Sequence, residues 1–367
     1  KRYHSFDYDC RERFGTKLYK LSLNAGFSCP NRDGTLDTRG CIFCSAGGSG
    51  EFAADKKLSI TQQIEQAKQL VASKNTSGRY IAYFQAYTNT YAPLPALEQV
   101  FFEAAGHPDI AALSIATRPD CLGSEVLSLL ARLNKFRPVT VELGLQTIHA
   151  ASAAFIRRGY PLSVYTDAVR ALNALGIGIV THLILGLPGE TRQDMLASVR
   201  HVCSLPLTGI KLSLLHVLKG TDLAAHYAAY PAAYPLMEFS SYLETLLSCL
   251  AAIPEDIVIH RLTGDGPKKL LIAPLWSANK KFVLNSIEKE MKRRDFRQGI
   301  SCTQNPGQKT TLDKKHLIFP RKGVPHATRG IDALQANDTL YSGQSRISAD
   351  TDAADQFPFG EGIYELF

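Results

Sequence analysis

From residue 17 to about residue 215, short apolar or β-branched runs alternate with stretches of helical period. This alternation is typical of parallel βα units, in which each strand is followed by a helix. Six strands are predicted, at Lys17–Leu23, Tyr80–Phe84, Ala111–Ala116, Thr140–Leu145, Ile177–Leu185 and Gly209–Leu215. The helices predicted between them are Ile60–Ser73, Ala96–Ala105, Ser124–Leu133, Ser163–Leu175 and Arg192–Leu205.

Six βα units are too few to close an eight-stranded barrel, so we expect an α/β fold built on an open, partial (β/α)6 TIM-type barrel. The barrel with its N-terminal lead-in is predicted over residues 1–225, and a C-terminal, substrate-side extension over 226–300. From 301 to 367 polar residues, Gly and Pro are frequent and no periodicity persists, which indicates a poorly ordered tail.

Three cysteines, Cys29, Cys41 and Cys44, directly follow the first predicted strand, which places them at the end of the barrel where chemistry gathers. The loop holds no fourth Cys or His, so a [4Fe–4S] cluster bound here would keep one iron open for a cofactor. A structural zinc site that recruits Cys10 or His4 is the alternative. A disulfide is disfavoured because the other cysteines lie far apart and no signal-peptide core is present, so we expect the reducing cytoplasm.

Polar residues gather where the later strands end, at 85–90 after the second strand and 117–120 after the third. Glu142 interrupts the apolar fourth strand, so its side chain is expected to point into the barrel, where a carboxylate needs a partner. In the loop 184–191, after strand five, the glycines allow backbone to approach a flat organic group, although a plain turn explains them equally well.

The composition describes a globular enzyme, with 45% hydrophobic and 20% charged residues among 367. No run approaches the length of a membrane span, so no membrane partner is expected. The net charge of +7 favours an anionic partner. Residues 280–297 predict an amphipathic helix with a basic face that could bind RNA phosphates, with a solvated helix face as the alternative.

The cysteine triad, with an aromatic residue just before Cys44, resembles the radical S-adenosylmethionine (SAM) superfamily. Order and spacing resemble the YhcC/YtqA-type members from about residue 3 to about residue 300. Six segments carry this likeness, at 26–34, 83–88, 117–120, 142–147, 182–190 and 209–212. Two of them, 117–120 and 142–146, also resemble the radical SAM domain of the elongator catalytic subunit, a tRNA-modifying protein. The eleven residues between Cys29 and Cys41 exceed the three that are usual in the superfamily.

The resemblance implies a [4Fe–4S] cluster on the three cysteines and SAM on the open iron. It implies SAM contacts from Gln85 and Thr88 to the methionine amino group, from Glu142 and Gln146 to the ribose and methionine parts, from Arg158 to the carboxylate, and from Gly186 and Leu187 to the adenine edge. Lys211, His216 and His260 are the candidates for substrate contact. No residue is assigned as catalytic.

The implied function is a radical SAM enzyme that cleaves SAM reductively and abstracts hydrogen from a substrate, for which the best interpretation is a modified tRNA wobble uridine. Such an enzyme needs an electron donor such as flavodoxin or ferredoxin. Two alternatives stay open. One is a small-molecule oxidoreductase of the anaerobic coproporphyrinogen oxidase type, and the other is a metal-binding regulatory protein without catalysis.

Overall fold

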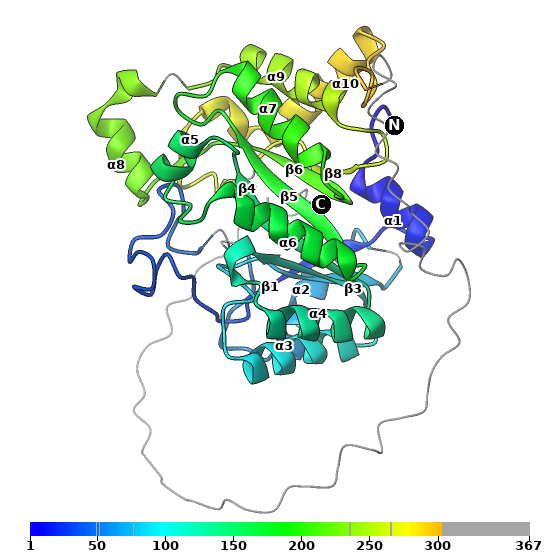
Figure 1. Cartoon of the computed structure of the whole chain (residues 1–367). Helices are drawn as coiled ribbons and strands as arrows, with labels where there is room; N and C mark the ends of the chain where they lie inside the picture. The colour runs from blue at the N-terminus through cyan, green and yellow to red at the C-terminus, as the bar shows by residue number, and fades with distance from the viewer. Residues whose placement is uncertain (49, 51, 76, 235, 265, 303–367) are drawn as a thin grey trace, which may run out of the picture.

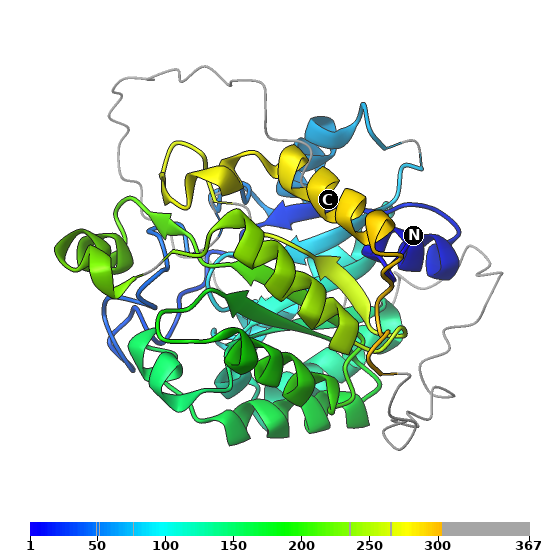
Figure 2. The ribbon, with the colours of Figure 1, turned by 90° about the horizontal axis from the view of Figure 1, so that it is seen from above.

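The computed structural model describes residues 1–302 except 49, 51, 76, 235 and 265, so the predicted tail lies outside the described residues from 303 on. In this part of the chain seven parallel strands form one sheet, in the order β1-β2-β3-β4-β5-β6-β8. They are β1 (Tyr19–Leu23), β2 (Tyr80–Phe84), β3 (Ile110–Thr117), β4 (Val139–Gln146), β5 (Gly178–Leu185), β6 (Gly209–Leu214) and β8 (Val258–Arg261). The sheet curls into an open half-barrel (Figures 1 and 2).

Helices cover the outer, convex face of this sheet (Figures 1 and 2). Those that follow the strands are α2 (Ile60–Val71), α3 (Leu94–Gly106), α4 (Ser124–Phe136), α6 (Leu162–Ala174), α7 (Arg192–Cys203), α9 (Phe239–Ala252) and α10 (Lys280–Arg293). Around the sheet lie α1 (Phe6–Phe14), α5 (Ala150–Phe155), α8 (Asp222–Ala229) and the short 3-10 turns η1 (Pro119–Cys121), η2 (Pro231–Ala233) and η3 (Leu275–Ala278). Strands β7 (Val217–Leu218) and β9 (Leu271–Ala273) pair as a small antiparallel ribbon. None of the helices in the described part of the chain has both the length and the apolar character that a membrane crossing needs.

The partial barrel predicted from the sequence is confirmed, and all six predicted strands are present. The predicted count is wrong by one strand. β8 pairs in parallel with β6, but its four residues carry too short an apolar run to be recognised as a barrel strand. It comes from the segment 226–300, so the predicted C-terminal extension also supplies part of the barrel sheet.

Strict alternation along the strands sorts side chains between the two faces of the sheet. On β4, Val141 and Leu143 belong to the large core beneath the helices, whereas Glu142 between them lines the interior of the half-barrel. Likewise Leu212 of β6 packs into the core while Lys211 faces inward. The same period places apolar residues of β4 and β6 under the helices and turns polar residues of these strands toward the cavity.

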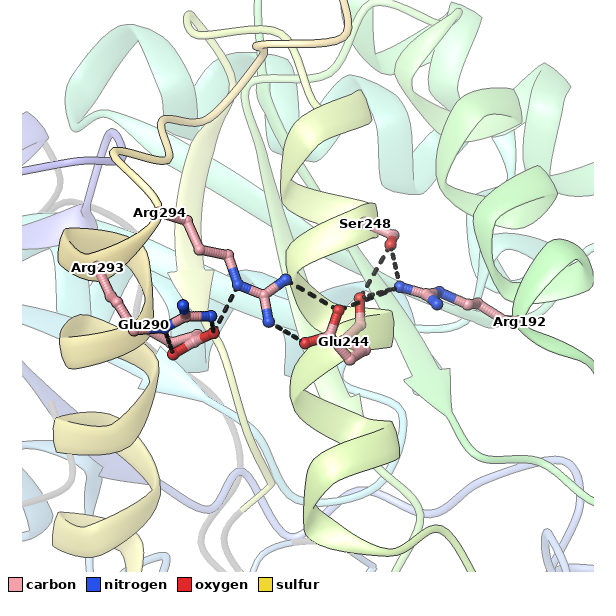
Figure 3. A network of polar contacts seen from close by, with 6 residues as sticks. All are labelled: Arg192, Glu244, Ser248, Glu290, Arg293 and Arg294. Atoms are coloured by element: carbon pink, nitrogen blue, oxygen red, sulfur yellow. Dashed lines mark hydrogen bonds and ion pairs between the residues drawn. The ribbon is translucent and has the colours of Figure 1, made fainter.

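A network of ion pairs joins α7, α9 and α10 across the outer surface (Figure 3). The guanidinium of Arg294 grips both carboxylate oxygens of Glu244 on α9 and also lies 2.5 Å from Glu290. Arg293 donates to the same Glu290 carboxylate at 2.6 and 2.9 Å, and Arg192 of α7 donates to Ser248 at 2.7 Å. The helix predicted at 280–297 therefore exists, with Arg293 and Arg294 bound to acidic residues of the chain itself.

Removing a ring from the core beneath α3 should destabilise the whole half-barrel. Phe101 is fully buried and meets Phe84 of β2 edge to face, with ring centroids 5.2 Å apart. We expect Phe101→Ala to lower the free energy of unfolding by about 3–5 kcal/mol, because the cavity it leaves cannot be refilled. Chemical denaturation measures this. Phe136→Ala is the control, since that ring is 56% exposed and should cost less than about 1 kcal/mol. Equal losses in the two variants would contradict the packing described.

Candidate functional site

The three cysteines lie on the loop that leaves β1, and all of them line one cavity of about 320 Å³ in the mouth of the half-barrel. The loop is held in place by buried polar contacts. The Arg32 guanidinium donates to the carbonyls of Cys44 and Ser45 at 2.9 and 2.6 Å. The fully enclosed Asn31 amide donates to the carbonyl of Arg157 at 2.7 Å and lies 3.5 Å from the Cys41 sulfur. The thiols are thus presented from a fixed backbone.

The three sulfurs line one cavity but are not gathered tightly around a single point. A single metal ion needs ligand atoms that lie close together. In the described part of the chain, three such atoms from His, Cys, Asp or Glu lie within 4.8 Å of one another at Glu65, His107 and Asp109. The sulfurs of the cysteine triad do not all lie within this limit. Thiolates on one zinc ion lie about 3.8 Å apart, as follows from Zn–S bonds of about 2.3 Å in a tetrahedron. The triad is therefore not arranged as ligands of one zinc ion, whereas the thiolates of a polynuclear cluster bind different irons and lie farther apart.

Glu65, His107 and Asp109 form a surface cluster of another kind. The ammonium of Lys68 lies 2.8 Å from Glu65 and 2.5 Å from Asp109, so a cation of the chain already occupies the space between the carboxylates. This group is an ion-pair cluster between α2 and the turn that follows α3.

Most of the residues predicted for cofactor or substrate contact do come together at the cavity. Its wall includes Gln85, Thr88, Glu142, Gln146, Arg158, Lys211 and His216. Three others are placed elsewhere among the described residues. Leu187 is buried in a small apolar cluster that includes Ile42 of the cysteine loop, and Gly186 precedes it outside the cavity wall. His260 lines a separate small cavity near α1, at the amino end of the barrel, where it stacks on Phe6.

The floor of the main cavity is built around the fully buried carboxylate of Glu142. One carboxylate oxygen, Oε1, lies 2.5 Å from Nζ of Lys20 and accepts a hydrogen bond from Ser114 at 2.6 Å. The other, Oε2, lies 2.5 Å from Nζ of Lys211 and 2.6 Å from Nε2 of His182. The expectation that Glu142 points inward and finds a partner is therefore confirmed, with partners from β1, β3, β5 and β6.

Tyr83 of β2 completes this cluster from the side. Its hydroxyl accepts a hydrogen bond from Lys211 at 3.1 Å, and the ammonium groups of Lys20 and Lys211 each lie 4.6 Å from its ring centroid. Stacking of a cation over an aromatic face stabilises the charged form where water is scarce.

The electrostatics of the cluster follow from burial and from these contacts. Burial alone would raise the pKa of Glu142, but the charges of Lys20 and Lys211 and the hydrogen bond from His182 outweigh it and hold that pKa well below its ordinary value. Burial lowers the pKa of Lys211 to about 7 although Glu142 favours its charged form, and Lys20 and Arg261 add repulsion. Burial, together with Lys211, also lowers the pKa of His182 to about 4, so its neutral ring donates from Nε2 to Glu142.

Two arginines fix the wall between this floor and the cysteines. Arg118 forms a bidentate pair with Asp120, at 2.9 and 2.7 Å, and donates to the carbonyl of Arg158 at 2.8 Å. Arg158 is buried and donates to the carbonyls of Thr147 and Tyr160, at 2.6 and 3.0 Å. The Arg158 side chain predicted to bind a carboxylate thus supports the loop after β4 with several of its donors.

Lys20, Ser114 and His182 were not singled out from the sequence as site residues. The signal was nevertheless present for two of them. Lys20 interrupts the apolar strand β1, and His182 interrupts β5, in the same way that Glu142 interrupts β4. A polar residue inside an apolar strand therefore indicates most of the residues that form the floor of the cavity.

Comparison with known proteins identifies relatives along the described part of the chain. The radical SAM superfamily model matches residues 38–202, and the radical SAM C-terminal domain model matches 207–293. YtqA of Bacillus subtilis is 43% identical over 82% of this chain and 92% of its own length. YhcC of Escherichia coli K12 is 36% identical over 75% of this chain and 87% of its own length.

A tRNA uridine(34) acetyltransferase of Dehalococcoides mccartyi is a more distant relative, 26% identical over 62% of this chain and 50% of its own length. Among solved structures, the Elp3 protein of Methanocaldococcus infernus with an N-terminal deletion superposes with a TM-score of 0.58. It covers 77% of this chain and 64% of its own, at 13% sequence identity, so the likeness concerns the fold alone.

Neutralising the central carboxylate should destabilise the fold in a pH-dependent way. We expect Glu142→Gln to lower the free energy of unfolding at pH 7 by about 3 kcal/mol, because two lysines are left without their anion. Since the pKa of Glu142 is depressed in the folded state, its stabilisation is complete above about pH 4.3, the unfolded value, and is lost as the pH falls further. Denaturation curves of both proteins at several pH values measure this.

The control is Glu98→Gln, which removes an ion pair to Arg132 whose two side chains are about half exposed. It should cost less than about 1 kcal/mol at neutral pH. A Glu142→Gln variant as stable as Glu98→Gln, or a difference from the wild type that grows on acidification, would contradict the charged cluster described here.

Proposed function

This chain belongs to the radical SAM superfamily and is a radical SAM enzyme, and we propose that Cys29, Cys41 and Cys44 hold its cluster beside a cavity for SAM and substrate. Members of the superfamily use a [4Fe–4S] cluster and SAM. The observation that supports the site assignment is the position of the three thiols around one cavity at the carboxyl ends of the strands. The chemistry these two groups supply when bound is reductive cleavage of SAM, which yields a carbon radical able to take hydrogen from a substrate.

The residues of the chain would bind the cluster and SAM and orient them relative to the substrate. Asn31 and Arg32 hold the cysteine loop, and burial raises the pKa of the Cys41 thiol to about 11, so loading iron there must displace a proton. We assign contacts with SAM to Gln85, Thr88 and Gln146, which line the cavity.

The adenine edge, assigned from the sequence to Gly186 and Leu187, is better served by the preceding part of β5. There Leu183 and Ile184 line the cavity, whereas Leu187 is 2% exposed and packs against the cysteine loop. We propose Ile184 and the backbone around it as the flat, apolar surface for the base. Glu142, saturated by four protein partners, would act on the floor by fixing Lys211 and His182 rather than by releasing its own contacts.

For the substrate we propose a modified uridine at the wobble position of tRNA. The support is the relative named tRNA uridine(34) acetyltransferase, the fold shared with Elp3, and the net charge of +7. The ion-pair network changes which residues would touch RNA. Arg293 and Arg294 are held by Glu290 and Glu244 (Figure 3). Lys292 lies 2.7 Å from Glu288. Phosphate contacts would therefore fall to the exposed Lys281, Lys289 and Arg297.

The cluster assignment predicts iron content. Anaerobically reconstituted protein should hold about four irons and cleave SAM slowly to 5′-deoxyadenosine on reduction, and replacing any one of Cys29, Cys41 or Cys44 by Ala should abolish both. Iron and sulfide analysis and chromatography of the nucleoside measure this. Cys203→Ala and Cys249→Ala are the controls, because both thiols are buried in the core beneath the helices. A full cluster in the triple Ala variant would refute the assignment.

The tRNA proposal predicts salt-dependent binding through α10. Affinity of the reconstituted protein for tRNA should fall with salt by a log–log slope of roughly −0.7 to −0.9 per phosphate contact, and Lys281→Glu with Lys289→Glu should flatten the slope. Lys135→Glu with Arg170→Glu, on α4 and α6, makes the same change in net charge and should not flatten it. Salt-insensitive binding, with unchanged tRNA nucleosides in cells that lack the protein, would favour a small-molecule oxidoreductase of the coproporphyrinogen oxidase type instead.

A further inference from the structure

The floor of the cavity holds one more buried cation than its carboxylate can balance. Lys20 and Lys211 are both about 5% exposed, and in the described part of the chain Glu142 is the carboxylate within ion-pair distance of each. His182 adds no charge at neutral pH, because burial lowers its pKa to about 4. Two ammonium groups therefore compete for one anion in a place where water is scarce.

The two lysines differ in what they face. Lys211 and His182 line the large cavity that opens between the cysteines and the floor, whereas Lys20 lines the small cavity near α1. A group bound in the large cavity would meet the ammonium of Lys211, the hydroxyl of Tyr83 and the edge of His182. The Lys211 ammonium is the charged donor at this point and suits an acceptor with negative charge, whereas the neutral His182 ring already donates from Nε2 to Glu142.

We propose that this floor is a binding site for an anionic group of the substrate, a carboxylate or a phosphate, which completes the charge balance of Lys20, Glu142 and Lys211. The proposal rests on the proposed radical SAM function of the same cavity and adds the chemical class of the substrate. The anion stabilises the charged form of Lys211, so its binding is accompanied by uptake of a proton at neutral pH.

The groups that set the charge of Lys211 come from every strand around it. They are Lys20 of β1, Tyr83 of β2, Glu142 of β4, His182 of β5, and His260 with Arg261 of β8. Burial together with Lys20 and Arg261 favours the neutral amine, and Glu142 favours the ammonium, so the pKa near 7 leaves both forms populated. A bound anion favours the ammonium form of Lys211. Because that form becomes rarer as the pH rises, the affinity for the anion should fall by about tenfold per pH unit above about pH 7.

The test uses iron-loaded protein with SAM and two anionic probes, uridine 5′-monophosphate and succinate, each paired with an uncharged analogue, uridine and succinamide. Isothermal titration calorimetry in two buffers of different ionisation heat gives the affinity and the number of protons taken up. We expect at least one anionic probe to bind at least tenfold more tightly than its analogue at pH 6.5, with uptake of up to one proton at pH 7.5. A preference for the nucleotide points to a phosphate, and one for succinate to a carboxylate.

Lys211→Met and Lys211→Arg complete the experiment. Lys211→Met leaves Lys20 and Glu142 as a balanced pair and should fold, but it should lose the preference for anions and the proton uptake together. Lys211→Arg should keep the preference and lose the uptake, since a guanidinium stays charged. Equal binding of charged and uncharged probes, or proton uptake that persists in Lys211→Met, would overturn the proposal. Wild-type protein that cleaves SAM but ignores both anions would refute this site and leave the radical function standing.

Discussion

The buried carboxylate of Glu142 is the contact on which the interior of the half-barrel depends. It is bonded by Lys20, Ser114, His182 and Lys211, which come from four other strands of the same sheet. Neither lysine could stay charged on the inner face without it, because isolated ions are strongly disfavoured in an environment of low polarity. The carboxylate thereby cross-links β1 to β6 through the middle of the curled sheet and fixes the positions of the donors that face the cavity.

A second set of contacts fixes the cysteine loop relative to that floor. Asn31 bonds the Arg157 carbonyl, and the Arg157 side chain in turn pairs with Asp222 at the start of α8. Apolar packing of Ile42 with Ile156 and Leu223 closes the same corner. The triad is therefore carried by a loop that is tied to the segment after α5 and to α8, and these contacts fix the thiols relative to the polar floor. Such fixed geometry is what chemistry with a reactive radical requires.

On the outer surface the charged groups form partly exposed ion pairs, in contrast to the buried cluster of the interior. Glu290 of α10 pairs with Arg293 and Arg294, and Glu244 of α9 pairs with Arg294, which ties the C-terminal helix to α9 (Figure 3). These pairs are partly exposed and individually contribute little to stability, but together they orient the helix. Part of the positive charge of the chain is thus used in holding helices together, whereas Lys281 and Lys289 are exposed on the same helix.

Local patterns in the sequence were enough to predict the order of the βα units, the position of Cys29, Cys41 and Cys44 at the mouth of the half-barrel, and the inward direction of Glu142. Each of these depends on neighbours along the chain: period, spacing, or one polar residue in an apolar strand. The pairing of Glu142 with Lys20 could not be predicted, although each interrupts an apolar strand, because Lys20 is 122 residues away and its strand does not pair with β4. Only the curl of the sheet brings the inner faces of non-adjacent strands within ion-pair distance. For the same reason, the pairing of β8 with β6 and the ion pair between Glu244 and Arg294 depend on tertiary packing, which no short stretch of sequence encodes.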